Sequence, residues 1–125
     1  MRGDIVSRPA YLTRHEAAKR QRVSLMSITR KVQAGQLSAL VLRSNLWRIE
    51  ARELDDQAPP AVPANLPPLV TTQWMADHWR VHPRTIHRLI HDNKLPARLV
   101  SGQWGMARRD FIRWVQDHTR GVDLP

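Results

Sequence analysis

The sequence predicts a mainly α-helical chain of two similar small units, each with a small β-hairpin, joined by a proline-rich linker. Three observations support this fold class. The first is an internal repeat, in which the segment from Leu12 to Ala39 aligns with the segment that starts at Val70, 58 residues later. The second is a proline-rich stretch between the two copies. The third is the same order of helix and hairpin signals in each copy.

Most positions matched by the repeat are ones that a small helical unit would bury, and one is an arginine. They pair Ala18 with Ala76, Val23 with Val81, Ile28 with Ile86, Arg30 with Arg88, Val32 with Ile90 and Leu37 with Leu95. The register then slips by one residue, so that Trp47 aligns with Trp104. A duplicated small basic unit is typical of a protein that binds neighbouring segments of a repetitive polymer, and nucleic acid is the first candidate.

Composition agrees with a polyanionic partner. The 125 residues include 20 Lys and Arg against 11 Asp and Glu, a net charge of +9, and both halves share the excess. The chain has no cysteine, which excludes disulfides and cysteine-ligated zinc. No apolar run predicts a membrane span and the N-terminus lacks a signal-peptide core, so we expect a cytoplasmic, nucleoid-associated protein with no membrane partner.

Residues 1–10 are expected to form a flexible arm, and residues 11–55 the first unit. Its two helices are marked by a capping box at Thr13 and Glu16, a cap at Ser24, a buried pair at Ile28 and Val32, and a terminating Gly35. Two β-prone runs around Arg43-Ser44-Asn45 then predict a hairpin, and Glu50–Leu54 a short closing helix.

Residues 56–69 are expected to form a semi-rigid linker with no packed element, because five prolines lie between Pro59 and Pro68. About 13 such residues span about 40 Å at ~3.1 Å each. Successive major-groove faces of a duplex repeat every ~34–36 Å. The linker is therefore long enough to place two units one helical turn apart on one side of a duplex.

Residues 70–120 are expected to form the second unit. Thr71 or Thr72 caps its first helix, Pro83 suits the first turn of the second, and Asn93 takes the place of Gly35 as a left-handed cap. A hairpin follows around Ser101-Gly102. A last helix from Arg108 to about His118 buries Phe111, Ile112 and Val115, which leaves Trp114 exposed. We expect Trp47 and Trp104 to anchor the two hairpins to their cores.

The order helix, short turn, helix, hairpin and closing helix is that of a winged helix-turn-helix, whose second helix enters the DNA major groove. The segments that show this order in the first copy are Leu12–Ala18, Val23-Ser24, Gly35-Gln36-Leu37 and Trp47-Arg48-Ile49. In the second copy they are Val81–Ile90 and Leu95-Pro96-Ala97. In these segments the chain resembles the excisionase-like, MerR-related DNA-binding domain, twice in tandem. The resemblance implies sequence-specific binding to double-stranded DNA by a phage or mobile-element excisionase or by a transcriptional regulator.

By this resemblance the recognition helices are Leu25–Ala34 and Pro83–Asp92, and the wings are Val41–Trp47 and Leu99–Trp104. Two departures concern the turn and the first recognition helix. Arg22 and Arg80 stand where the family usually has glycine. The first copy also has Leu25 and Met26 where the family has polar residues. These two apolar side chains suit contact either with thymine methyl groups or with a neighbouring protein.

The candidate DNA contacts are polar or basic side chains on the outer faces of these helices and on the wings. In the first copy they are Ser24, Met26, Ser27, Thr29, Arg30, Arg43, Asn45 and Arg48; in the second they are Arg84, Thr85, His87, Arg88, His91 and Gln103. The helical spacing of His87 and His91 would also suit a metal ion, but no carboxylate or cysteine completes a site, so we expect no metal and no cofactor.

Three classes of function remain open. The first is a DNA-binding regulator or excisionase, with an integrase or a second copy as further partner. The second is the DNA-recognition small subunit of a phage packaging terminase, or a protein-interaction module. The third is an enzyme, which we do not expect, because the sequence has no phosphate-binding loop, carboxylate pair or nucleophile–histidine set. No small-molecule substrate is expected.

Overall fold

A computed structural model describes residues 8–120, and these form two compact units. Unit 1 contains the described residues up to Ala61 together with Thr119 and Arg120, and unit 2 is Val62–His118. Most of the expected flexible arm, residues 1–7, lies outside the described residues. Within residues 8–120 no helix has the length and apolarity that crossing a membrane requires.

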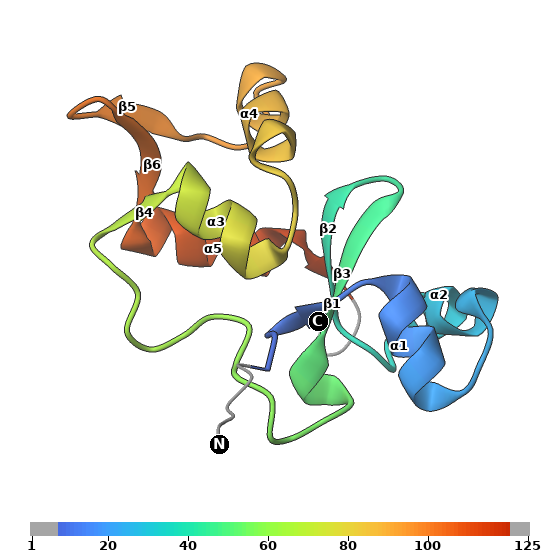
Figure 1. Cartoon of the computed structure of the whole chain (residues 1–125). Helices are drawn as coiled ribbons and strands as arrows, with labels where there is room; N and C mark the ends of the chain where they lie inside the picture. Colours follow the sequence, from blue (N-terminus) through green and yellow to red (C-terminus); the bar gives the residue numbers. More distant parts are fainter. Residues whose placement is uncertain (1–7, 121–125) are drawn as a thin grey trace. The chain divides into compact units, whose positions relative to one another are not determined.

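Unit 1 is built from short strands, two helices and a hairpin (Figure 1). In chain order they are β1 (Tyr11–Leu12), α1 (Arg14–Gln21), α2 (Leu25–Gln33), β2 (Ala39–Arg43), β3 (Leu46–Glu50), the 3-10 turn η1 (Ala51–Glu53) and β7 (Thr119–Arg120). The two predicted helices and the hairpin are confirmed. The closing helix expected over Glu50–Leu54 is only the single turn η1.

The two helices of unit 1 begin where their caps predict. The hydroxyl of Thr13 accepts a hydrogen bond from the Glu16 amide at 3.1 Å, and the Glu16 carboxylate accepts one from the Thr13 amide at 2.8 Å. This reciprocal pair satisfies two amides that a helix start leaves open. Ser24 caps α2 through the Ser27 amide at 3.1 Å, and Gly35 follows α2 with φ of 77°.

The sheet of unit 1 has the strand order β1-β3-β2-β7, and all its pairs are antiparallel. Strand β7 pairs with the start of β2, Thr119 opposite Leu40 and Arg120 opposite Ala39. The sequence assigns these two residues to the second unit, whereas the contacts assign them to unit 1. A two-residue strand has no alternation pattern, so neither β1 nor β7 was predictable.

The core of unit 1 lies between its helices and its sheet. Ile28 is fully buried and Val32 is 3% exposed, as their spacing predicts. Burying side chains of this size stabilises the fold by about 1.5–3 kcal/mol each. Ala58 also belongs to this core, at 4% exposure. The expectation that the proline-rich segment contains no packed residue was therefore wrong at Ala58. Its small side chain packs against residues from distant parts of the chain, and no local sequence pattern predicts such a contact.

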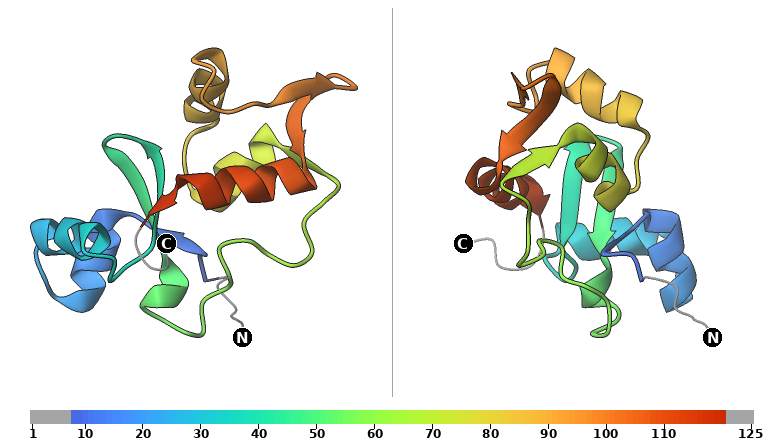
Figure 2. Two further views of the ribbon diagram at one scale, coloured as in Figure 1. Left: turned by 180° about the vertical axis from the view of Figure 1, so that it is seen from behind. Right: turned by 60° about the vertical axis from the view of Figure 1, so that its left-hand side comes forward.

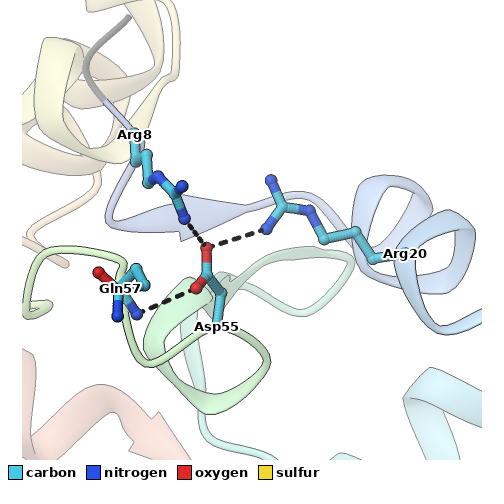
Figure 3. Close-up of polar contacts among 4 residues, drawn as sticks. All are labelled: Arg8, Arg20, Asp55 and Gln57. Carbon is cyan, nitrogen blue, oxygen red and sulfur yellow. Dashed lines mark hydrogen bonds and ion pairs between the residues drawn. The ribbon is translucent and has the colours of Figure 1, made fainter. Parts of the chain in front are cut away.

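An aspartate shortly after η1 joins three parts of unit 1 (Figure 3). The Asp55 carboxylate accepts a hydrogen bond from Arg8 at 2.6 Å, lies 3.7 Å from the Arg20 guanidinium, and accepts a further bond from the Gln57 amide at 3.0 Å. The bond from the Gln57 amide, followed by the nearby arginines, holds the pKa of Asp55 below its ordinary value.

Unit 2 repeats the element order of unit 1 and adds a full closing helix. Its elements are β4 (Leu69–Thr71), α3 (Thr72–Trp79), α4 (Pro83–His91), β5 (Arg98–Val100), β6 (Gln103–Ala107) and α5 (Arg108–His118). The strands form an antiparallel sheet of order β4-β6-β5. Both views in Figure 2 show α4 and the β5–β6 hairpin projecting from the layer that contains α3 and α5.

The tight turns of both units use left-handed residues. Arg22 and Arg80, which replace the expected glycine between the two helices, both have φ of 56°. Asn93 after α4 has φ of 59°, which confirms its predicted role as a left-handed cap. The turn residues Ser101 and Gly102 have φ of 50° and 80°, as a two-residue hairpin with right-handed twist requires.

An aromatic cluster fills the core of unit 2. The Trp79 ring stacks on Phe111 and on Trp114, with ring centres 5.6 and 5.4 Å apart, and the Trp114 indole donates a hydrogen bond to the Lys94 carbonyl at 2.9 Å. Trp114 is only 6% exposed, so its predicted exposure was wrong. Phe111, Trp114 and Val115 follow the i, i+3, i+4 spacing of a buried helical face, which Ile112 does not share.

Candidate nucleic-acid interface

Helix α4 separates a buried face from a polar, basic face. Ile86 is fully buried and Leu89 is 1% exposed, which anchors the helix against the core. Four side chains of α4 are exposed: Arg84, His87, Arg88 and His91. The structure thus brings together on one helix face four of the six contacts predicted for the second copy.

The first turn of α4 is held by its cap. The His82 ring nitrogen Nδ1 accepts a hydrogen bond from the Arg84 amide at 3.0 Å, and the His82 carbonyl accepts one from the Thr85 amide at 2.8 Å. Pro83 occupies the first helical position, where its missing amide proton costs nothing. Thr85, a further predicted contact, is half-buried next to this turn.

The second hairpin, β5–β6, carries Gln103, the remaining predicted contact of unit 2, and this residue is exposed. Three apolar side chains on the same hairpin are exposed too: Leu99 at 59%, Val100 at 43% and Trp104 at 39%. Trp104 therefore does not anchor the hairpin to the core as expected. Leu99 lies opposite Trp104 in the strand pairing, so these two apolar side chains share one face of the hairpin.

The charge of unit 2 favours an anionic partner. Residues 62–118 contain eight Arg and Lys and four Asp, a net charge of +4. On α4 the outer face has two arginines and no acidic residue. A surface of this sign attracts the phosphate backbone of nucleic acids at long range and gives salt-dependent binding.

Helix α2 presents a less basic face in unit 1. Met26 is 58% exposed and Leu25 is 36% exposed at its start, and Arg30 is exposed one turn further on. Ser24 and Ser27 are bound to each other at 3.1 Å within the helix cap. Thr29 is half-buried, and its hydroxyl accepts a hydrogen bond from Arg14 at 3.4 Å. Five of the eight contacts predicted for the first copy therefore lie on α2 or at its cap, but Ser24, Ser27 and Thr29 also form hydrogen bonds within the fold.

The first hairpin, β2–β3, exposes two of its three predicted contacts. Arg43 and Asn45 are exposed at and beside the turn. Arg48 is 9% exposed, and its guanidinium donates a hydrogen bond to the Trp47 carbonyl at 3.0 Å. The prediction of Arg48 as a surface contact was therefore wrong, because its side chain is turned back onto the hairpin.

Arg14 is a residue that the sequence analysis did not single out. Its guanidinium donates to the Asn45 carbonyl at 3.2 Å and lies over the Trp47 ring. It therefore helps to position the first hairpin relative to both helices. No local signal in the sequence predicts this role, because Trp47 is 33 residues further along the chain.

The histidines do not assemble a metal site in the described part of the chain. No group of three or more His, Asp, Glu or Cys side chains with the arrangement of a metal site is found among residues 8–120. His78 stacks on Trp74, with ring centres 4.6 Å apart, and His118 stacks on Trp114 at 3.9 Å. These two rings therefore pack against tryptophans, Trp74 being half-buried and Trp114 buried, whereas His87 and His91 are exposed.

Two helices joined by a tight turn, the second with a polar outer face, define a helix-turn-helix domain in unit 2. The comparison with protein families agrees: residues 69–119 match the family described as "Helix-turn-helix domain". The match begins with the first residue of β4 and takes in both helices, the hairpin and α5. No curated protein and no solved structure matches the chain significantly. The fold of unit 2 thus supports DNA binding by a helix-turn-helix.

Proposed function

We propose that the chain binds double-stranded DNA in a sequence-specific manner, with α4 of unit 2 inserted into the major groove. The observation that carries this proposal is the outer face of α4, on which Arg84, His87, Arg88 and His91 are all exposed while Ile86 and Leu89 hold the opposite face in the core. An α-helix fits the major groove, where each base pair presents a distinct pattern of donors and acceptors.

The two arginines suit different parts of such a contact. Arg88 lies in the middle of the outer face, and an arginine there can donate two hydrogen bonds to one guanine, which is worth about 1–3 kcal/mol of discrimination. Arg84, next to the N-terminus of the helix, suits a phosphate because the helix dipole also favours negative charge there. Gln103 on the second hairpin suits the neighbouring backbone or minor groove.

We further propose that unit 1 is a second DNA-binding unit of the same type, so that the two form a tandem pair of winged helix-turn-helix units. The same order of strand, helix, helix and hairpin, the same left-handed turn at Arg22 and Arg80, and the aligned pair Arg30 and Arg88 support it. Two weak binding units joined by a linker gain avidity when both reach the same duplex. Exposed Leu25 and Met26 favour, as a second candidate, a protein contact for α2.

In the cell we propose a role without catalysis. Occupying a site and bending it would serve an excisionase that helps to assemble an integrase complex, or a regulator that blocks a promoter. A small subunit of a packaging terminase would use the same DNA contacts, and is the alternative. A DNA-binding protein of any of these kinds would act in the cytoplasm, at the nucleoid.

The test is binding to double-stranded DNA from the protein's own locus, followed by gel shift and by protection mapping at several salt concentrations. We expect affinity that falls steeply with salt and two protected patches about one helical turn apart. Arg88→Ala should weaken specific binding by about tenfold or more.

The matched control is Arg120→Ala, which removes the same charge from an exposed position in β7 and should change the affinity far less. Equal losses for the two variants would exclude α4 as the recognition helix. A single protected patch that depends only on Arg88 would mean that unit 1 has another role. Binding that is absent for every double-stranded oligonucleotide, or indifferent to salt, would overturn the proposal as a whole.

A further inference from the structure

Unit 2 has a recess between the start of β5 and one face of α5. Its volume is about 320 Å³, within the range of sites that bind ligands or peptide segments. Six residues line it: Pro96, Arg98, Asp110, Arg113, Trp114 and Asp117. The four on α5 follow helical spacing and so share one face of the helix. Pro96 and Trp114 give the recess apolar surface between charged groups.

Among the residues that the structure describes, the charged side chains around this recess have no partners. Arg98, Asp110, Arg113 and Asp117 form no side-chain hydrogen bond and no ion pair with any of residues 8–120. Two positive and two negative side chains therefore surround one recess without neutralising each other. Such a lining suits a ligand that itself has both signs of charge. It does not suit a nucleic acid, because the two aspartates would repel phosphate.

The recess adjoins the open edge of a sheet. Within the described part of the chain β5 pairs with β6 alone, so its other edge has no neighbour. Val100 and Gln103 flank the two-residue turn and therefore exchange main-chain hydrogen bonds in such a hairpin. Pairs alternate along the strands, so the main-chain N–H and C=O of Leu99 point to the open edge. An open edge is a template for a further strand.

In unit 1 the corresponding sheet edge is covered by another strand. Strand β2 is the counterpart of β5, and there the same edge is covered by β7. Strand β7 pairs at Ala39 and Leu40, and the residues 58 positions later are Ala97 and Arg98. Arg98 lines the recess. The internal repeat therefore places the edge that β7 covers in unit 1 at the recess of unit 2, directly before Leu99.

We propose that the recess and the open edge of β5 form an acceptor site for an extended peptide of mixed charge from a partner protein. The peptide adds a strand to β5 through the main chain of Leu99, places a basic side chain towards Asp110 and Asp117, and an acidic one towards Arg98 or Arg113. Peptides bind sheet edges in this way in other recognition domains. This site would bind a protein segment, so a test of it does not depend on whether the chain binds DNA.

The exposed apolar side chains of the second hairpin fit this arrangement. Leu99 is 59% exposed within β5 itself, and Val100 beside it is 43% exposed. An added strand would cover part of both, since neighbouring strands lie about 4.8 Å apart and their side chains are in contact.

The experiment uses the full isotope-labelled chain and a synthetic peptide with the sequence of residues 117–122, Asp-His-Thr-Arg-Gly-Val. This probe contains the strand that covers β2 in unit 1 and has both charges. We expect saturable amide shifts at Arg98–Val100 and along Asp110–Asp117, with a dissociation constant of about 1 mM or below. No saturable shift, or shifts at Ala39 and Leu40 alone through exchange with β7, would overturn the proposal.

Two matched comparisons test the mode of binding. Leu99→Pro removes the amide proton at the open edge, where proline is tolerated, and should weaken the probe about fivefold, as the loss of one hydrogen bond predicts. Leu99→Thr keeps the amide proton and should change binding less. Equal affinities for these two variants would exclude strand addition.

The charge arrangement is tested without the proline variant, in case that variant disturbs the hairpin. Asp117→Arg should weaken the original probe severalfold, and a probe with glutamate in place of its arginine should regain that loss on Asp117→Arg. If the glutamate probe binds both forms of the chain equally, the basic side chain does not face α5 and the proposal fails.

Discussion

The guanidinium carbon of Arg14 lies 4.7 Å from the centre of the Trp47 ring. The same guanidinium donates hydrogen bonds to the hairpin at Asn45 and to α2 at Thr29. One side chain at the start of α1 therefore joins all three structural parts of unit 1: its first helix, its second helix and its hairpin. A cation over an indole ring adds about 0.5–1 kcal/mol at a partly exposed site.

Unit 2 lacks this contact, and its tryptophan is correspondingly more open. The residue that corresponds to Arg14 is Thr72, which is too short to reach the hairpin. Trp104 is 39% exposed, whereas Trp47 is half-buried against the core of unit 1. The two hairpins thus differ in a contact made by one residue pair, Arg14 and Trp47, that the repeat does not preserve.

Arg14→Ala should destabilise unit 1 by about 1 kcal/mol, because it removes the ring contact together with two long or exposed hydrogen bonds. The measurement is urea unfolding followed by the NMR signals of unit 1, which separates this unit from unit 2. Lys19→Ala is the matched control, since Lys19 is an exposed cation on the same helix. Equal losses would show that only the charge of α1 matters.

Arg22→Gly should stabilise unit 1 by up to about 1 kcal/mol. Arg22 has φ of 56°, a conformation that costs a residue with a Cβ atom roughly 1–2 kcal/mol. Glycine avoids this cost, but part of the gain is offset because glycine loses more backbone entropy on folding. Arg22→Ala removes the same side chain but keeps the Cβ atom, and should give no such gain. The midpoint of urea unfolding distinguishes the two variants. A gain that is equal in both would assign the effect to charge.

Elements with local signals were predictable, and contacts between distant segments were not. The capping box at Thr13 and the left-handed cap at Asn93 depend on residues within one helical turn, and both are confirmed. The repeat also predicted the same element order in both units.

The errors at Arg48 and Trp114 have a common physical cause. The Arg48 guanidinium donates to the hairpin main chain, and Trp114 packs on α3 and on the loop after α4. Such burial depends on neighbours that only the folded chain supplies. For the same reason neither the contacts of Arg14 nor strand β7 could be predicted from the sequence. The outer face of α4 was predictable because helical periodicity alone separates it from the core.

Gly105→Ala should destabilise unit 2 by about 1–3 kcal/mol, the usual cost of overpacking. A Cβ atom on Gly105 would lie 2.8 Å from the Val70 carbonyl and 3.0 Å from the Leu69 side chain, so that strand β4 would have to move away from β6. Hydrogen exchange at Val70 and Met106, which pair across these strands, should accelerate.

The control for that variant is Gly102→Ala. A Cβ atom at this turn meets nothing within 4 Å, and the cost comes only from its φ of 80°. Exchange at Val70 should therefore change much less than with Gly105→Ala. Similar acceleration in both variants would show that the close approach at Gly105 does not limit the packing of β4.

Two carboxylates of unit 1 should contribute to stability with opposite dependence on pH. The pKa of Asp55 is held below its ordinary value of 3.8, first by the Gln57 amide, so its folded state prefers the charged form. Its contribution is present above about pH 4 and is lost as the pH falls through the lowered pKa. Burial, and then the charge of Glu53, raises the pKa of Glu50 above 4.5.

Glu50 therefore lowers the stability at neutral pH, and this effect disappears as the pH falls through its raised pKa towards 4.5 and below. Asp55→Asn should decrease the free energy of unfolding at pH 7, and Glu50→Gln should increase it. At a pH below the lowered pKa of Asp55, where both carboxyl groups bind protons, the two variants should approach the unsubstituted chain. Urea unfolding between pH 3 and 7 measures both effects, and two curves that shift in the same direction would contradict the opposite environments of Asp55 and Glu50.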